Sequence, residues 1–242
     1  MKKKLTITIA SILSVIVIIG VGFAAWVITN PNVKDEANGT ISVETVTDKS
    51  YSLTATISGE AISFGAPATM DTTNAWLTNN SGKPENLTAT LTLTLKYNNL
   101  ADVGEITFKM ETLKDSVADN TFKELVDGKY IVNPTISYKE NAETYTAITA
   151  ENKTVFDGLN IPEGAFKETT PPTGSAMGVK TATIKITFGW GSVFGNTNPY
   201  TYFNGESHSY DKDYTTAKAA LTELTKLTGV SYKVTVTGTT AA

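Results

Sequence analysis

The sequence contains no cysteine and no arginine, and it has one histidine among 242 residues. The absence of cysteine excludes disulfide bonds, thiolate nucleophiles and thiolate metal sites, so the fold depends on packing and hydrogen bonding. The absence of arginine removes the side chain that binds phosphate or guanine through two parallel hydrogen bonds. Because the net charge is also −4, we expect no binding to nucleic acid.

Charged residues are few as well, at 18%, whereas hydrophobic residues make up 40% of the chain. This composition is typical of a globular protein and differs from that of disordered chains. The sequence shows no internal repeat at a fixed period and no linker between domains. We therefore expect one folded domain with insertions.

The N-terminus carries a long stretch without charge, from Leu5 to Ile28, directly after the lysines Lys2 to Lys4. As a helix, this stretch is long enough to span about 30 Å of hydrocarbon. The positive end is expected to stay in the cytoplasm, so that the rest of the chain is exported. We interpret residues 1–28 as a hydrophobic helix that is either a signal peptide or a membrane anchor.

Small residues near the end of this stretch offer a cleavage site for signal peptidase, after Ala24 or Ala25. If the stretch is not cleaved, residues 5–28 anchor the protein in the membrane. Residues 29–38 then form a spacer and residues 39–242 the folded domain. The predicted location is extracellular or at the cell surface.

Alternation of apolar and polar residues is the main structural signal of the remaining chain. In "LTATLTLTLKY" (87–97) leucines alternate with threonines, as in a strand with one buried and one hydrated face. Similar patterns occur in the ranges 51–57, 105–110, 130–138, 179–190 and 230–238. With turn residues between these ranges, the sequence predicts an all-β, antiparallel two-sheet sandwich. In the fourth range, Asn133-Pro134 predicts an edge or bulged position, because proline cannot donate to a β-ladder.

Helical periodicity appears in "DYTTAKAALTELTKLTG" (213–229), where apolar residues recur on one face. Asp213 is the expected N-cap and Gly229 the expected stop. The sequence therefore predicts one C-terminal amphipathic helix that packs on an edge or end of a sheet. A shorter helix is expected near residues 121–126.

Residues for catalysis are scarce. The single histidine, His208, lies in the polar segment "GESHSYDKD", which lacks the G-x-S-x-G context of a serine nucleophile and the H-E-x-x-H pair of a zinc peptidase. A calcium site in "SYDKDY" is an alternative to an acidic helix start. We assign no catalytic, cofactor or metal-binding residue.

Aromatic residues are densest in "FGWGSVFGNTNPYTYFNGESHSY" (188–210), together with glycine and asparagine. Rings beside asparagines suit the stacking and hydrogen bonding of a sugar. One hypothesis is thus a carbohydrate-binding surface made of Trp190, Phe194, Tyr200 and Tyr202. The alternative is a glycine-rich corner whose rings close one end of the sandwich.

The leader end "GVGFAAWVITN", the following "ANGTISVETV" and the late "FGWGSVFGNTNPYTYFN" before a helix and a last strand resemble the TasA/camelysin group. These proteins are biofilm-matrix fibre subunits of Firmicutes, exported through a SipW-type signal peptidase. The resemblance covers the first 46 and roughly the last 60 residues. The junction Ala25 to Thr29 lacks the acidic residue usual in the group, so the resemblance leaves the processing peptidase open.

This resemblance implies a jelly-roll-like sandwich whose N-terminal strand is donated to a neighbouring subunit. Such a donor strand must be extended, alternating and loosely tethered. The residues Ile41, Val43 and Val46, which follow the spacer, fit this role. The alternative is that this strand pairs within its own domain.

We therefore expect an exported structural protein of the cell surface or matrix that self-associates through β-strand donation, without enzymatic activity or cofactor. Other matrix proteins or cell-wall glycan are further expected partners. One alternative is a metal-dependent peptidase, because camelysin-like members of the group carry that label. The other alternative is a carbohydrate-binding or adhesive module.

Overall fold

The structure is a computed structural model that describes residues 15–17, 43–45, 51–58, 62, 64, 69–71, 76–78, 85–174, 176–203 and 210–240. Most of the expected leader, the spacer 29–38, Ile41, Val46 and His208 lie outside these residues. Within the leader only β1 (Val15–Val17) is described, and it is a strand rather than part of the expected helix.

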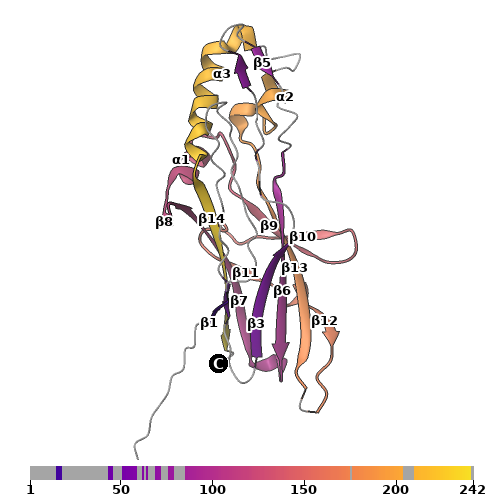
Figure 1. Cartoon of the computed structure of the whole chain (residues 1–242). Helices are drawn as coiled ribbons and strands as arrows, with labels where there is room; N and C mark the ends of the chain where they lie inside the picture. The colour runs from indigo at the N-terminus through magenta and orange to yellow at the C-terminus, as the bar shows by residue number, and fades with distance from the viewer. Residues whose placement is uncertain are drawn as a thin grey trace, which may run out of the picture.

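Two antiparallel sheets form the body of the molecule, as the alternation predicts (Figure 1). The larger sheet has the order β10-β9-β13-β6-β3, with β12 also paired to β13. Its strands are β3 (Tyr51–Ser58), β6 (Thr88–Tyr97), β9 (Thr135–Lys139), β10 (Tyr145–Ile148), β12 (Lys167–Thr170) and β13 (Gly178–Thr187).

The second sheet has the order β11-β7-β14, with the short strand β8 also paired to β7. Its strands are β7 (Val103–Lys114), β8 (Val117–Ala118), β11 (Leu159–Ile161) and β14 (Val230–Thr240). Two small hairpins accompany the sheets: β1 with β2 (Val43–Thr45), and β4 (Thr69–Asp71) with β5 (Trp76–Thr78).

The register of β6 and β13 explains how the core forms. Thr92 lies opposite Thr183, and Leu93 lies opposite Ala182, so one face of this strand pair is mostly polar and the other mostly apolar. Leu93 and Ala182 are buried in one hydrophobic cluster with Phe108 of the second sheet. Burial of a leucine side chain of this kind stabilises the fold by about 1.5–3 kcal/mol.

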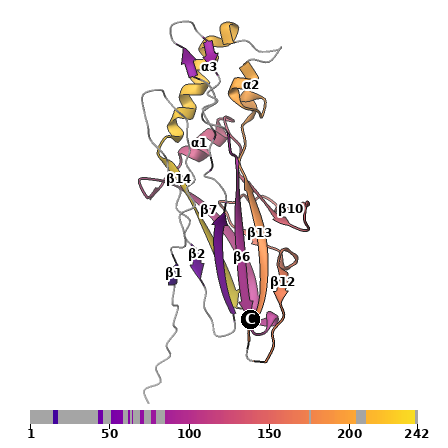
Figure 2. The ribbon, with the colours of Figure 1, turned by 45° about the vertical axis from the view of Figure 1, so that its right-hand side comes forward.

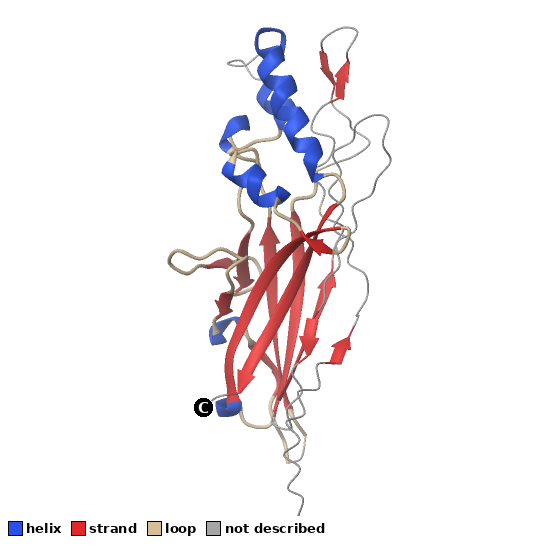
Figure 3. Cartoon of the chain, turned by 90° about the vertical axis from the view of Figure 1, so that its left-hand side faces the viewer, coloured by secondary structure: helices blue, strands red, loops and turns tan. Residues whose placement is uncertain are grey.

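The described α-helices gather at one end of the sandwich, whereas the 3₁₀ helices Leu100–Asp102 and Glu163–Ala165 lie away from it (Figures 1 and 3). The α-helices are α1 (Thr121–Asp127), α2 (Pro199–Phe203) and α3 (Tyr210–Leu224), and the last is followed by a 3₁₀ turn, Thr225–Leu227. The predicted C-terminal helix is thus confirmed, and so is the short helix near residue 121. Leu224, the last residue of α3, and Leu227, in the 3₁₀ turn that follows it, are fully buried in the common core.

Two details of the prediction are wrong. Helix α3 begins at Tyr210, so Asp213 is its fourth residue and not its N-cap, because nothing in residues 210–212 prevents helix formation. Strand β9 lies inside the sheet and not at its edge, because it begins only at Thr135, directly after Pro134. The proline interrupts the segment instead, and Ile131 upstream of it forms an isolated bridge to Trp190.

Candidate assembly site at the open sheet edges

The two sheets end on the same side of the sandwich in strands that are paired on one side only. Among the described residues, β3 pairs only with β6 and β14 pairs only with β7. The two strands are close neighbours. A Cβ atom on Gly238 of β14 would lie 3.3 Å from the Tyr51 ring of β3. We call this side, formed by β3 and β14, the open edge.

The open edge is long. Strand β14 has 11 residues and β3 has 8, whereas β8, β10, β11 and β12, on the opposite side, have between 2 and 4 residues each. An unpaired edge presents free backbone donors and acceptors at every second residue, which can pair with another strand. The length difference makes the open edge the side of the sandwich best suited to accept one.

The side chains along the open edge provide an apolar layer for such a strand. Tyr51 and Leu53 of β3 are fully buried, and so are Val234 and Val236 of β14. They alternate with polar residues that face outward. An added strand with the same alternation would extend both the hydrogen bonding and this apolar layer.

Strand β2 lies against the open edge. It neighbours β14 and β3, as can be followed in Figure 2. Its backbone pairs antiparallel with β1, with Val43 opposite Val17 and Thr45 opposite Val15. Of the three predicted assembly residues, Val43 is therefore placed beside the open edge, while Ile41 and Val46 lie outside the described residues.

The aromatic residues of the predicted ligand surface lie at the helical end of the sandwich. Trp190 is 3% exposed and Phe194 is fully buried, while Tyr200 and Tyr202 are partly buried against the same cluster. The rings of Trp190 and Phe194 meet edge to face, with centroids 5.9 Å apart. A ligand at this surface would meet Tyr200 and Tyr202, and carbohydrate binding there stays a prediction.

A carboxylate that sequence reasoning missed holds this region in place. Glu85 Oε2 accepts a hydrogen bond of 2.8 Å from the Trp190 indole Nε1 and one of 2.9 Å from Asn198 Nδ2. Residue 191 nearby must be glycine, because a Cβ atom on Gly191 would collide with the Lys129 carbonyl oxygen. The glycine-rich sequence therefore serves the close packing of this end.

Burial perturbs the acidity of tyrosines near both ends of the sandwich. Tyr232, on β14, is 2% exposed, and burial raises the pKa of its hydroxyl far above the usual value. Burial, followed by the charge of Glu168, raises the pKa of Tyr97. Both tyrosines are thus held neutral as core residues.

Within the described ranges, no group of histidine, aspartate and glutamate residues is arranged to hold a metal ion. The same ranges contain no helix long and apolar enough to cross a membrane. The candidate site supported by geometry is therefore the open edge.

Comparison of the chain with protein-family models, curated proteins and solved structures finds no match.

Proposed function

We propose that the chain is an exported, non-enzymatic structural protein of the cell surface or extracellular matrix that self-associates by β-strand pairing. In this proposal the segment 39–46 of one copy adds to the open edge of the next copy. The sandwich would be jelly-roll-like, as the sequence resemblance implies.

The observation that carries the proposal is the pairing of β2. Among the described residues its only ladder partner is β1, which lies inside the expected leader. Cleavage after Ala24 or Ala25 would remove β1 and leave the backbone groups of Val43–Thr45 without that partner. A strand that has lost its ladder partner is suited to pair with a long unpaired edge such as the open edge, and we propose that this edge belongs to the next copy.

Deletion of residues 39–46 from the chain that begins at Trp26 tests the proposal. We expect the intact mature chain to form polymers that sediment, and the deleted chain to remain monomeric with an unchanged far-UV circular dichroism spectrum. The matched control removes the same number of residues from the spacer, 31–38, which shortens the tether but keeps the strand.

The two deletions give opposite expectations. Polymers should persist, with altered assembly rate, when the spacer is shortened, because the donor strand remains. Polymers that persist after deletion of 39–46 would contradict the proposal, and so would loss of polymers in both variants.

A further inference from the structure

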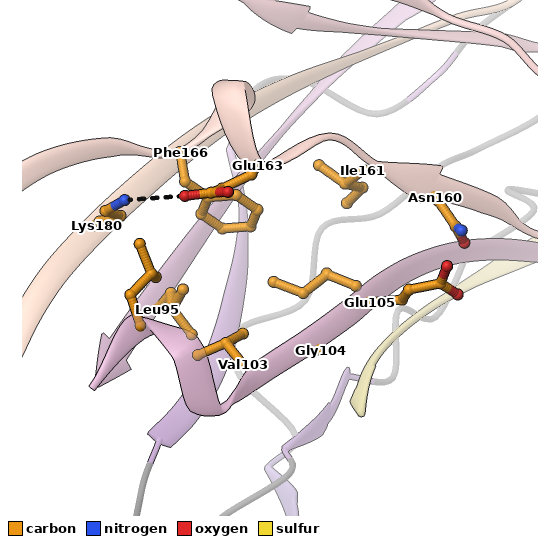
Figure 4. A pocket seen from close by; sticks show the side chains of 11 residues that line it. Leu95, Val103, Gly104, Glu105, Asn160, Ile161, Glu163, Phe166 and Lys180 are labelled. Atoms are coloured by element: carbon orange, nitrogen blue, oxygen red, sulfur yellow. Dashed lines mark ion pairs between the residues drawn. The ribbon is translucent and has the colours of Figure 1, made fainter. Parts of the chain in front are cut away.

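A pocket of about 390 Å³ opens between the two sheets, away from the three α-helices; Figure 4 shows it from close by. This volume lies in the usual range for small-molecule sites. Leu95, Ile106, Ile161 and Phe166 give it an apolar floor, drawn from both sheets and their connections. Four polar side chains stand at its two ends: Lys180 and Glu163 at one, Glu105 and Asn160 at the other.

Lys180 occupies an inward position of its strand. It is in phase with the buried residues Ala182, Ile184 and Ile186 of β13, and it lies opposite the buried Leu95 of β6. Its side chain is 13% exposed. A lysine in this position is unusual, because burial of an ammonium group is unfavourable unless the charge is paired and hydrogen-bonded.

The structure leaves the Lys180 ammonium poorly satisfied. Glu163 Oε1 lies 3.8 Å from Nζ, which is too long for a hydrogen bond, and the Glu163 side chain is 76% exposed. The Tyr97 ring centroid lies 5.9 Å away. None of the described residues accepts a hydrogen bond from this ammonium, which has three donors. Because Lys180 lines the pocket, a ligand there can accept hydrogen bonds from its ammonium group.

The other end of the pocket limits the charge of a ligand. The Glu105 carboxylate stands beside Asn160, whose Oδ1 accepts a hydrogen bond of 3.0 Å from Thr107 Oγ1. A second anionic group at that end would be repelled by Glu105. The arrangement thus suits one anionic head at Lys180 and an uncharged body along the floor.

We propose that this pocket binds a small amphipathic monocarboxylate, a free acid with a short aliphatic or aromatic body. The carboxylate pairs with the Lys180 ammonium through charge-assisted hydrogen bonds, and Glu163 turns toward solvent. The hydrocarbon body lies on Leu95, Ile106 and Phe166 and replaces water there.

Equilibrium dialysis of the mature chain against sodium octanoate, below its micelle concentration, tests the proposal. We expect saturable binding of about one octanoate per chain. Octanol and octylammonium serve as probes of equal length, without charge and with the opposite charge. Both should bind at least about tenfold more weakly, since each loses the charge-assisted pair with Lys180.

Two substitutions separate binding from folding. Lys180→Met keeps the length of the stem and should weaken octanoate about tenfold or more, while Glu163→Gln removes the competing carboxylate and should tighten it. Lys185→Met is the matched control, because Lys185 lies on the same strand with its ammonium over the Tyr145 ring at 4.2 Å.

The proposal is overturned if octanoate shows no saturable binding, if octylammonium binds as well as octanoate, or if Lys180→Met and Lys185→Met bind octanoate equally. These results do not depend on polymer formation, so the pocket and the assembly proposal can fail separately.

Discussion

At the scale of single residues, the helical end of the sandwich depends on one carboxylate. Glu85 accepts hydrogen bonds from Trp190 and Asn198, which are far away in sequence. Because Trp190 is buried, its indole N–H loses the hydrogen bond to Glu85 in a largely dry environment if Glu85 is removed. An unsatisfied buried donor costs the full desolvation of that group.

We therefore expect Glu85→Ala to lower the free energy of unfolding by about 1–3 kcal/mol. Urea unfolding followed by tryptophan fluorescence measures this change. Glu151→Ala, in an exposed turn, is the control and should stay within about 0.5 kcal/mol of the wild type. Equal stability of both variants would show that the Glu85 hydrogen bonds contribute nothing.

The buried hydroxyl of Tyr232 predicts a loss of stability in alkali. Burial raises the pKa of Tyr232 in the folded state, whereas the unfolded chain ionises near the usual value of about 10. Its contribution is fully present below that value and is lost as the pH rises further, because the unfolded state releases its proton first. We expect the free energy of unfolding to fall steeply above pH of about 10.

Urea unfolding at several pH values checks this expectation with two variants. Tyr232→Phe should flatten the decline, since phenylalanine has no proton to lose. Tyr138→Phe, which removes the same hydroxyl from a partly buried site on β9, is the matched control. A decline as steep in Tyr232→Phe as in the wild type would rule out this tyrosine as the cause.

Which residues face inward could be predicted only where the pattern is regular. The leucines of 87–97 were assigned to one face by alternation alone, and the structure buries Leu91, Leu93 and Leu95. Trp190 and Phe194 could not be assigned, because an aromatic cluster suits a surface and a core equally well. Lys180 was missed, although a lysine in phase with Ala182 and Ile184 is a signal that can be read from sequence.

At the scale of elements, the long strands and the C-terminal helix follow from periodicity, but the order of strands does not. Register and neighbours depend on contacts between distant segments, such as β14 with β7, which no local pattern contains. For the same reason, the sequence alone does not predict that β3 and β14 form the open edge.

The turn between β7 and β8 holds two residues other than glycine at positive φ, and substitution can relieve this strain. Asp115 and Ser116 have φ angles of 52° and 66°, in the left-handed region, as a two-residue hairpin turn requires. Asn-Gly is the preferred pair for this turn. We expect Asp115→Asn combined with Ser116→Gly to raise the free energy of unfolding by about 0.5–1 kcal/mol.

The midpoint of urea unfolding measures this effect, since both residues of the turn are exposed. Ser116→Val is the opposite variant, because a β-branched residue is disfavoured at positive φ, and it should lower the midpoint. A midpoint lowered by the Asn-Gly pair would mean that the turn is not under strain.

At the scale of the whole molecule, the sandwich is elongated, with the three α-helices at one end and the C-terminal end of β14 at the other (Figures 1 and 3). The open edge runs along its length, so copies that pair through this edge can form a chain without covering the helical end. The pocket at Lys180 lies away from the three α-helices, and its lining does not include residues of β3 or β14.

Export, leader and donor strand are predictions from the sequence, and most of their residues lie outside the described ranges. The structure contributes two long strands, β3 and β14, that are each paired on one side only among the described residues, and the pairing of β2 with β1. The central claim is therefore that, in the mature chain, β2 pairs with another copy.

Cross-linking through introduced cysteines tests this claim, since the sequence has no cysteine to interfere. Glu44→Cys, on β2, is combined in turn with Lys233→Cys, Thr235→Cys or Thr237→Cys on β14, in the chain that begins at Trp26. Glu44→Cys alone is the control and can give at most a linked dimer.

After oxidation, the products are separated by denaturing electrophoresis without reductant. The account predicts that at least one pair yields a ladder of linked multimers, which collapses to monomer on reduction. Monomers that carry only an internal disulfide, in every pair, would contradict it.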